Sequence, residues 1–239
     1  MVTSTHPSVL GDPKFIITSI PGKGMGVVAT RPIVKGEEVL SEAPLFTQQL
    51  SRNAQTIADS LFPKTADEKH QFLDLTNCHK GKLPPLVGIF QTNVLPCGNN
   101  GTHGEIASKG GLFLQGSRFN SSCVPNVNNY WNERRQVIGF RALRNIAEGE
   151  ELCISYTSEM KSRDSRKLML RKNFGFECHC AACSLSGDEL RASDHRRTTL
   201  DSLYDEIGKC GSQSAVGIRK VWRTLRNLWY RASNFAPWR

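Results

Sequence analysis

RFNSSCVPN at residues 118–126 decides the fold, together with GEELCISY at residues 149–156. The sequence between them, VNNYWNERRQVIGFRAL, has two β-rich arms joined by the polar turn NERR, which predicts a β-hairpin. GEELCISY follows another polar turn and predicts a short buried strand. The centre of the chain is therefore expected to consist of short strands.

Short strands are also expected on the N-terminal side of this centre. FIITSI is β-branched, GKGMG interrupts it, VVAT resumes it, and a further strand follows within residues 31–46. Residues 51–80 differ, because their apolar residues recur at helical spacing. We expect a helical insertion over about 47–85 that Pro84 and Pro85 close, with short strands again from about residue 86. This pattern favours an α+β fold with a mostly β core over alternating parallel units.

The C-terminal side is predicted to be mostly helical. SEMKSRDSRKLMLRKNF reads as a helix, and a cluster of cysteines follows it. After Ser184 the composition becomes helical again. One apolar stripe is expected to be a packing face, and it comprises Ile218, Val221, Trp222, Leu225, Leu228 and Trp229.

Composition places the chain among soluble globular proteins. It has 239 residues, 38% hydrophobic and 22% charged, enough for one full-sized core and a smaller appendage. The first twenty residues lack a basic start and an apolar stretch, and no apolar run approaches the roughly 18 residues of a membrane span. We expect an intracellular protein of the nucleus, the cytoplasm or both.

The formal net charge is +9, and part of it is concentrated over residues 161–172. Six basic residues stand there against one acid, Asp164: Lys161, Arg163, Arg166, Lys167, Arg171 and Lys172. A basic patch can attract nucleic acid, so a weak nucleic-acid contact is one interpretation. A solvated helix face is the other.

Three cysteines fall within six residues, at Cys178, Cys180 and Cys183. A tight cluster in a chain without a secretory signal is typical of a metal site rather than a disulfide framework. Structural zinc takes four ligands in a tetrahedron, so a fourth must come from one of the five other cysteines. His179 lies between two of the ligands and would struggle to reach the same ion. A cysteine-rich turn without metal is the alternative.

Four segments in this order and spacing resemble the signatures of SET-domain lysine methyltransferases: GKGMG at 22–26, RFNSSCVPN, GEELCISY and FECHCAAC at 176–183. The resemblance is closest to the SET-and-MYND branch and its fungal-type relatives. We expect no MYND finger, which that branch carries as an insertion, because Cys78 is the one cysteine in residues 47–85 and no finger-like Cys/His pattern is present there.

The resemblance implies a SET-domain fold with a knot-like C-terminal crossing. The SET domain is expected over 14–160, a linking helix with a zinc-bearing post-SET segment over 161–185, and a helical tail over 186–239. It also implies S-adenosylmethionine as cofactor, structural zinc, and a protein substrate, histone or non-histone, that presents a lysine.

The resemblance also assigns roles to single residues. Cys123 becomes the fourth zinc ligand, beside Cys178, Cys180 and Cys183. Tyr156 matches the catalytic tyrosine of the family. The residues expected to line the cofactor pocket are Lys23, Gly24, Met25, Gly26, Asn93, Asn120, Ser121 and Phe176.

One residue departs from the family pattern, because Ser121 stands where the family usually has histidine. This departure leaves a second hypothesis open, a catalytically silent SET module that binds protein partners or chromatin. The retained Asn120, Tyr156 and Phe176 favour an active enzyme.

Overall fold

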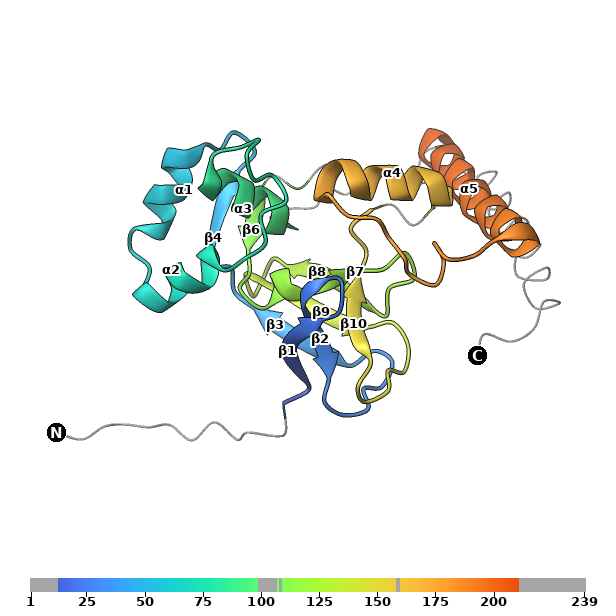
Figure 1. Ribbon diagram of the computed structural model, residues 1–239, viewed down its shortest axis with the longest axis horizontal. Coiled ribbons are helices and arrows are strands. Elements are labelled where there is room, and N and C mark those ends of the chain that lie inside the picture. Colours follow the sequence, from blue (N-terminus) through green and yellow to red (C-terminus); the bar gives the residue numbers. More distant parts are fainter. Residues whose placement is uncertain (1–12, 99–106, 108, 158–159, 211–239) are drawn as a thin grey trace. The chain divides into compact units, whose positions relative to one another are not determined.

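The computed structural model describes residues 13–98, 107, 109–157 and 160–210. The chain divides into two compact units, Met1–Tyr156 and Thr157–Arg239. Among the described residues, the N-terminal unit contains all the strands, and the C-terminal unit contains two helices and the three clustered cysteines (Figure 1).

A four-stranded sheet joins the two motif segments of the N-terminal unit. Its order is β1 (Phe15–Ile20), β2 (Gly24–Ala29), β10 (Glu151–Ile154) and β7 (Asn120–Ser121). β2 pairs antiparallel with β1 and with β10, whereas β10 pairs parallel with β7. The strands predicted at FIITSI, VVAT and GEELCISY are confirmed. The knot-like crossing stays a prediction of the resemblance.

Two three-stranded antiparallel sheets complete the strands of the described residues. The first has the order β3 (Glu38–Glu42), β9 (Val137–Ala142), β8 (Val127–Asn132), which confirms the predicted hairpin around NERR. The second has the order β4 (Phe46–Gln49), β6 (Lys109–Leu112), β5 (Leu95–Cys97).

The predicted helical insertion is present and extends further than the sequence indicated. α1 (Ala54–Leu61) and α2 (Ala66–Leu73) each begin at a capping box. A third helix, α3 (Pro85–Asn93), occupies the place where short strands were expected from residue 86. The two prolines were interpreted as the end of the insertion, but proline is also favoured in the first turn of a helix, where its missing N–H has no partner to lose.

Two hydrophobic clusters stabilise this unit. One packs the three helices against the second three-stranded sheet (Figure 1), with the rings of Phe46 and Phe90 stacked 5.5 Å apart between centroids. The other packs residues of the remaining two sheets together with Cys97 of β5, and the rings of Phe119 and Phe140 stack there at 4.4 Å. Phe119 is fully buried and directly precedes Asn120, so the core fixes the start of the central motif.

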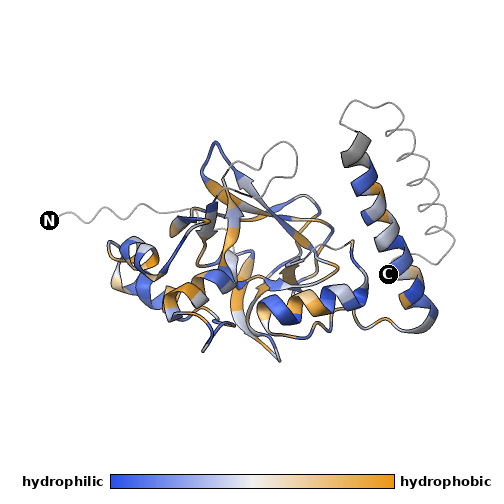
Figure 2. Ribbon diagram, turned by 90° about the horizontal axis from the view of Figure 1, so that it is seen from above, coloured by the Kyte–Doolittle hydropathy of each residue, from blue (hydrophilic) through white to orange (hydrophobic). Residues whose placement is uncertain are grey.

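The C-terminal unit contains α4 (Arg163–Phe174) and α5 (Gly187–Cys210), as the sequence predicted. Ser162 caps the start of α4, and Gly175 ends it in the left-handed conformation with φ of 73°. Figure 2 shows that α5 is mostly hydrophilic along its described length. No described helix has both the length and the apolar character to cross a membrane. The predicted apolar stripe with Trp222 and Trp229 lies outside the described residues.

Candidate active site and cysteine cluster

Strands β7 and β10 bring the RFNSSCVPN and GEELCISY segments together. Asn120 pairs with Cys153 and Ser121 pairs with Ile154 in parallel register. The ladder continues one residue beyond β7, where the N–H of Ser122 donates to the carbonyl of Ile154 at 2.9 Å. The two motifs are therefore adjacent through backbone hydrogen bonds, which depend little on side-chain identity.

Asn126 reinforces this junction from inside the protein. It is only 3% exposed, and its Nδ2 donates to the carbonyl of Glu151 at 2.8 Å and to Oε1 of Glu150 at 3.0 Å. Its Oδ1 accepts the N–H of Cys153 at 2.8 Å. A buried amide with three partners holds its loop against β10. The sequence interpretation quoted Asn126 within its motif but gave it no role.

The GKGMG segment meets Asn120 at the start of β2. Gly24 has φ of 77°, which favours glycine. A Cβ on Gly26 would lie 2.6 Å from Nδ2 of Asn120 and 2.5 Å from Cγ1 of Ile20. Gly26 therefore allows the Asn120 side chain to approach the strand, where its Nδ2 donates to the carbonyl of Met25 at 3.3 Å.

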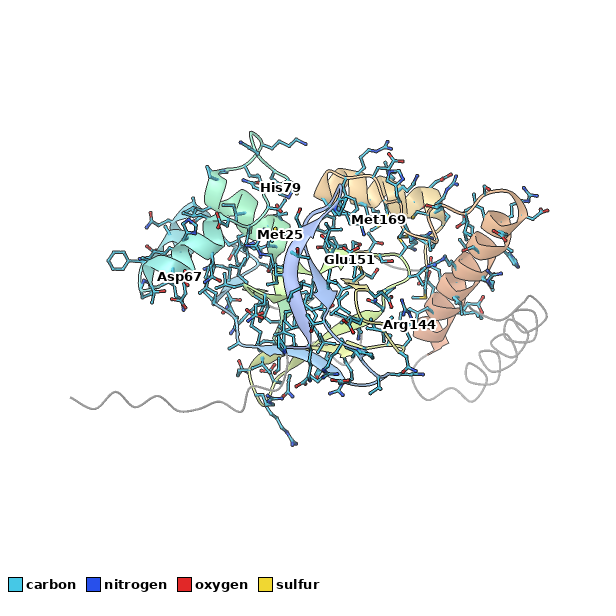
Figure 3. All side chains as sticks on the ribbon, turned by 60° about the horizontal axis from the view of Figure 1, so that its bottom comes forward. Met25, Asp67, His79, Arg144, Glu151 and Met169 are labelled. Carbon is cyan, nitrogen blue, oxygen red and sulfur yellow. The ribbon has the colours of Figure 1, made fainter. Side chains whose placement is uncertain are left out.

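Glu151 connects the predicted cofactor residues with one another. Its Oε1 accepts from Nδ2 of Asn120 at 3.0 Å, and its Oε2 pairs with Nζ of Lys23 at 2.5 Å. Figure 3 labels Glu151 on β10 and Met25 on the neighbouring strand β2. One carboxylate thus orients side chains from two motifs. The sequence interpretation missed it, although the acidic pair in GEEL was visible.

Tyr156 follows β10 and packs against the hydrophobic cluster that contains Phe119 and Phe140. Its hydroxyl donates to the carbonyl of Phe119 at 2.7 Å, and its N–H donates to Oγ of Ser121 at 3.4 Å. Burial raises the pKa of the Tyr156 phenol well above its usual range, and the nearby Cys153 and Glu151 act in the same direction. The side chain therefore remains a neutral hydroxyl. Ser121, in place of the usual histidine, supports the backbone of this tyrosine.

The other two predicted cofactor residues lie away from this junction in the sequence. Asn93 ends α3 and is buried, and its Nδ2 donates to the carbonyls of Thr76 and Ile89, both at 2.7 Å. Both amide hydrogens thus hold the insertion together, and a cofactor contact would have to use its carbonyl groups. Phe176 follows the cap of α4 and is half-buried within the C-terminal unit.

Three of the four predicted zinc ligands come together in the C-terminal unit. The Sγ atoms of Cys178, Cys180 and Cys183 lie within 4.8 Å of one another. A tight turn forms this arrangement, because the N–H of Cys183 donates to the carbonyl of Cys180 at 2.9 Å. The side chain of His179 is exposed, in line with its predicted exclusion. A converging set of thiols suits zinc.

Cys123, the fourth predicted ligand, belongs to the N-terminal unit. It lies two residues after the end of β7 and is 2% exposed. Its position in the motif ties it to the same backbone ladder that holds Asn120 and Ser121. Its role as a ligand remains a prediction.

The basic residues of 161–172 are largely paired within the C-terminal unit. Lys161 pairs with Asp201 at 2.6 Å, and Lys167 pairs with Glu177 at 2.9 Å. Glu177 also pairs with Arg171. Hydrogen bonds from Lys167 and then Arg171 lower the pKa of Glu177 to about 2, so it remains charged and offsets part of the basic face.

The sequence profile of the SET domain matches residues 24–157. The chain is 36% identical to histone-lysine N-methyltransferase set5 of Schizosaccharomyces pombe, over 89% of this chain and 63% of that protein. It is 29% identical to the putative SET domain-containing protein L678 of Acanthamoeba polyphaga mimivirus, over 77% of this chain and 83% of that protein. A shorter match, 42% identical, covers 33% of this chain and 20% of the protein-lysine N-trimethyltransferase SMYD5 of Mus musculus.

Proposed function

The chain belongs to the SET domain family, and from this premise we propose that it transfers a methyl group from S-adenosylmethionine to a lysine side chain of a protein. The chain spans 63% of the length of the fission-yeast relative, so the activity is proposed for the residues in hand. The observation that carries the proposal is the meeting of Lys23, Asn120 and Tyr156 around one sheet.

The polar groups of this junction fit such a cofactor. The Nδ2 of Asn120 donates to Glu151 and to the carbonyl of Met25. The other polar atom of this side chain, Oδ1, is a hydrogen-bond acceptor and could accept from the ammonium group of S-adenosylmethionine. The ammonium group of Lys23 could also pair with the carboxylate of S-adenosylmethionine. S-adenosylmethionine, when bound, supplies the electrophilic methyl group.

The tyrosine suits the methyl acceptor as well. A lysine amine must be neutral to attack, although its ordinary pKa is about 10.4. An apolar site disfavours the ammonium form, and a neutral phenol does not restabilise it as a carboxylate would. Tyr156 stays neutral because burial raises its pKa, and Phe119 fixes the direction of its hydroxyl. We propose Tyr156 as the catalytic residue that orients the amine.

Zinc is proposed as a structural cofactor bound by Cys123, Cys178, Cys180 and Cys183. Three converging thiols support this site, and tetrahedral zinc needs a fourth ligand, for which the family resemblance names Cys123. Metal analysis of the purified chain should give one zinc per chain. Cys123→Ser should weaken zinc binding strongly, whereas Cys78→Ser should not, and equal retention by both variants would exclude Cys123.

The substrate is proposed to be a histone or another lysine-bearing protein in the nucleus or the cytoplasm. The name of the fission-yeast relative supports a histone. A weak nucleic-acid contact through residues 161–172 is a secondary proposal, and it relies on charge that Glu177 and Asp201 do not offset.

The decisive assay is methyl transfer from labelled S-adenosylmethionine to histones and to cell lysate. The wild-type chain should label a protein lysine, and Tyr156→Phe should reduce labelling by at least about a hundredfold while it still binds the cofactor. Tyr130→Phe removes a different hydrogen-bonded hydroxyl and should keep full activity. Cofactor binding without transfer by the wild type would favour the silent module instead.

A further inference from the structure

Arg166 is the largest fully buried side chain in the described residues, with 0% exposure. It belongs to the basic stretch of α4, whose other members face solvent at least in part. A buried guanidinium is costly to desolvate and cannot lose its charge, so it requires anionic or hydrogen-bonding partners inside the protein. Its partners therefore indicate why it is buried.

Within the C-terminal unit, Arg166 contacts Lys161, Asp194 and Cys183. One terminal nitrogen donates to the carbonyl of Lys161 and lies 3.9 Å from Oδ1 of Asp194. The other donates to Sγ of Cys183 at 3.9 Å. A close charge-assisted bond measures about 2.7–2.9 Å, so the carboxylate is not in tight contact with the guanidinium.

Asp194 is also engaged elsewhere. Its Oδ1 accepts the N–H of Arg163 at 2.8 Å, and its side chain is 27% exposed. A partly exposed carboxylate that is shared in this way compensates a buried cation only in part. The guanidinium also reaches the Sγ of Cys183 at 3.9 Å, and this sulfur belongs to the cysteine cluster.

We propose that Arg166 is a positioning residue for the zinc–thiolate cluster and compensates its negative charge from the side of α4. This inference rests on the proposed zinc site. Zinc with three thiolates carries one net negative charge and with a fourth carries two, and this charge is buried with Cys178 and Cys183. A guanidinium that donates to a ligand sulfur stabilises the thiolate form and fixes the direction of the ligand.

The arrangement also couples the helix to the metal segment. Arg166 lies one turn into α4, whereas Cys183 follows the end of that helix in the sequence. Metal binding at the cysteines would therefore stabilise α4 through Arg166.

The test compares zinc affinities of the full chain by competition with a chromophoric chelator. Arg166→Met removes charge and donors, Arg166→Gln removes charge but keeps a donor, and Arg166→Lys keeps the charge. Lys172→Met removes an exposed charge from the same helix and is the matched control. Circular dichroism establishes that each variant is folded.

Zinc affinity should fall by about 10- to 100-fold in the Met variant, fall by about tenfold in the Gln variant, and stay within about threefold in the Lys variant and the Lys172 control. If the Met variant does not fold, the comparison of Gln with Lys decides the same question. Wild-type affinity in either neutral variant, or equal affinity in the neutral and Lys variants, overturns the proposal. A wild-type chain that binds no zinc would instead remove the proposed metal site.

Asp194→Asn separates the two candidate partners of Arg166. If the arginine serves the cluster, this variant should keep zinc affinity within about threefold of wild type, because the sulfur contact remains. A loss as large as that of Arg166→Met would assign the arginine to Asp194 and contradict the proposal.

Discussion

Glu151 holds two of the proposed cofactor residues through one carboxylate. Glu151→Gln keeps an acceptor for Asn120 but loses the charge that attracts Lys23. We expect affinity for S-adenosylmethionine to fall about tenfold, because a hydrogen bond to a charged group contributes at least ~1.5 kcal/mol. Isothermal titration calorimetry measures the affinity of each variant for S-adenosylmethionine. Glu148→Gln removes an exposed carboxylate nearby and should leave the affinity unchanged, and an unchanged affinity in Glu151→Gln would refute this role.

Tyr156 gives a prediction about pH. Its folded pKa is raised above the unfolded value of about 10, so its contribution to stability is complete below pH 10 and is lost as the pH rises further. The loss should approach at most about 1.4 kcal/mol per pH unit. Urea unfolding at pH 9 and pH 11 tests this, and Tyr156→Phe should lose less stability than wild type. Equal losses would show that the phenol titrates normally.

Some properties of these residues can be predicted from the sequence, and others depend on the folded structure. Tyr156, Asn120 and the three clustered cysteines stand out by motif and spacing. In the structure Asn120 contacts Glu151, Tyr156 contacts Phe119, and the three cysteines lie together. The hydrogen bond of Tyr156 to the carbonyl of Phe119 leaves no trace in the sequence, because every residue has a carbonyl. Burial of Arg166 was also invisible, because a basic residue at helical spacing ordinarily faces solvent.

Gly175 determines how α4 ends. It ends α4 with φ of 73°, immediately before the segment that contains Phe176 and the cysteines. Gly175→Ala should lower the free energy of unfolding by about 1 kcal/mol, since a Cβ is strained in this conformation. Gly175→Asn should cost less, because asparagine tolerates it. Urea titration distinguishes them, and an alanine variant as stable as wild type would contradict the account.

Most elements were predictable because their residues alternate or repeat with a clear period. The hairpin around NERR and the helix at 163–174 are examples. α3 was not, because its two prolines resemble a terminator and its run of apolar residues resembles a buried strand. Packing against β4 and β6 decides the conformation there, and that information lies outside the segment.

The whole chain belongs to the SET domain family, and we propose that its parts have the limits 14–160, 161–185 and 186–239. If zinc is structural, its removal should destabilise the chain. A strong chelator should lower the melting temperature by at least ~5 °C, since ~1 kcal/mol corresponds to ~2–4 °C at this size. Cys183→Ser should melt at the same temperature with and without chelator. A wild-type chain indifferent to the chelator would contradict a structural metal.

Binding of S-adenosylmethionine to the zinc-loaded chain tests the central claim most directly, because every proposed role of the junction depends on it. Calorimetry should show one site per chain, and Asn120→Ala should weaken that site by about tenfold or more. A folded, zinc-loaded chain that gives no binding would contradict the proposed methyltransferase.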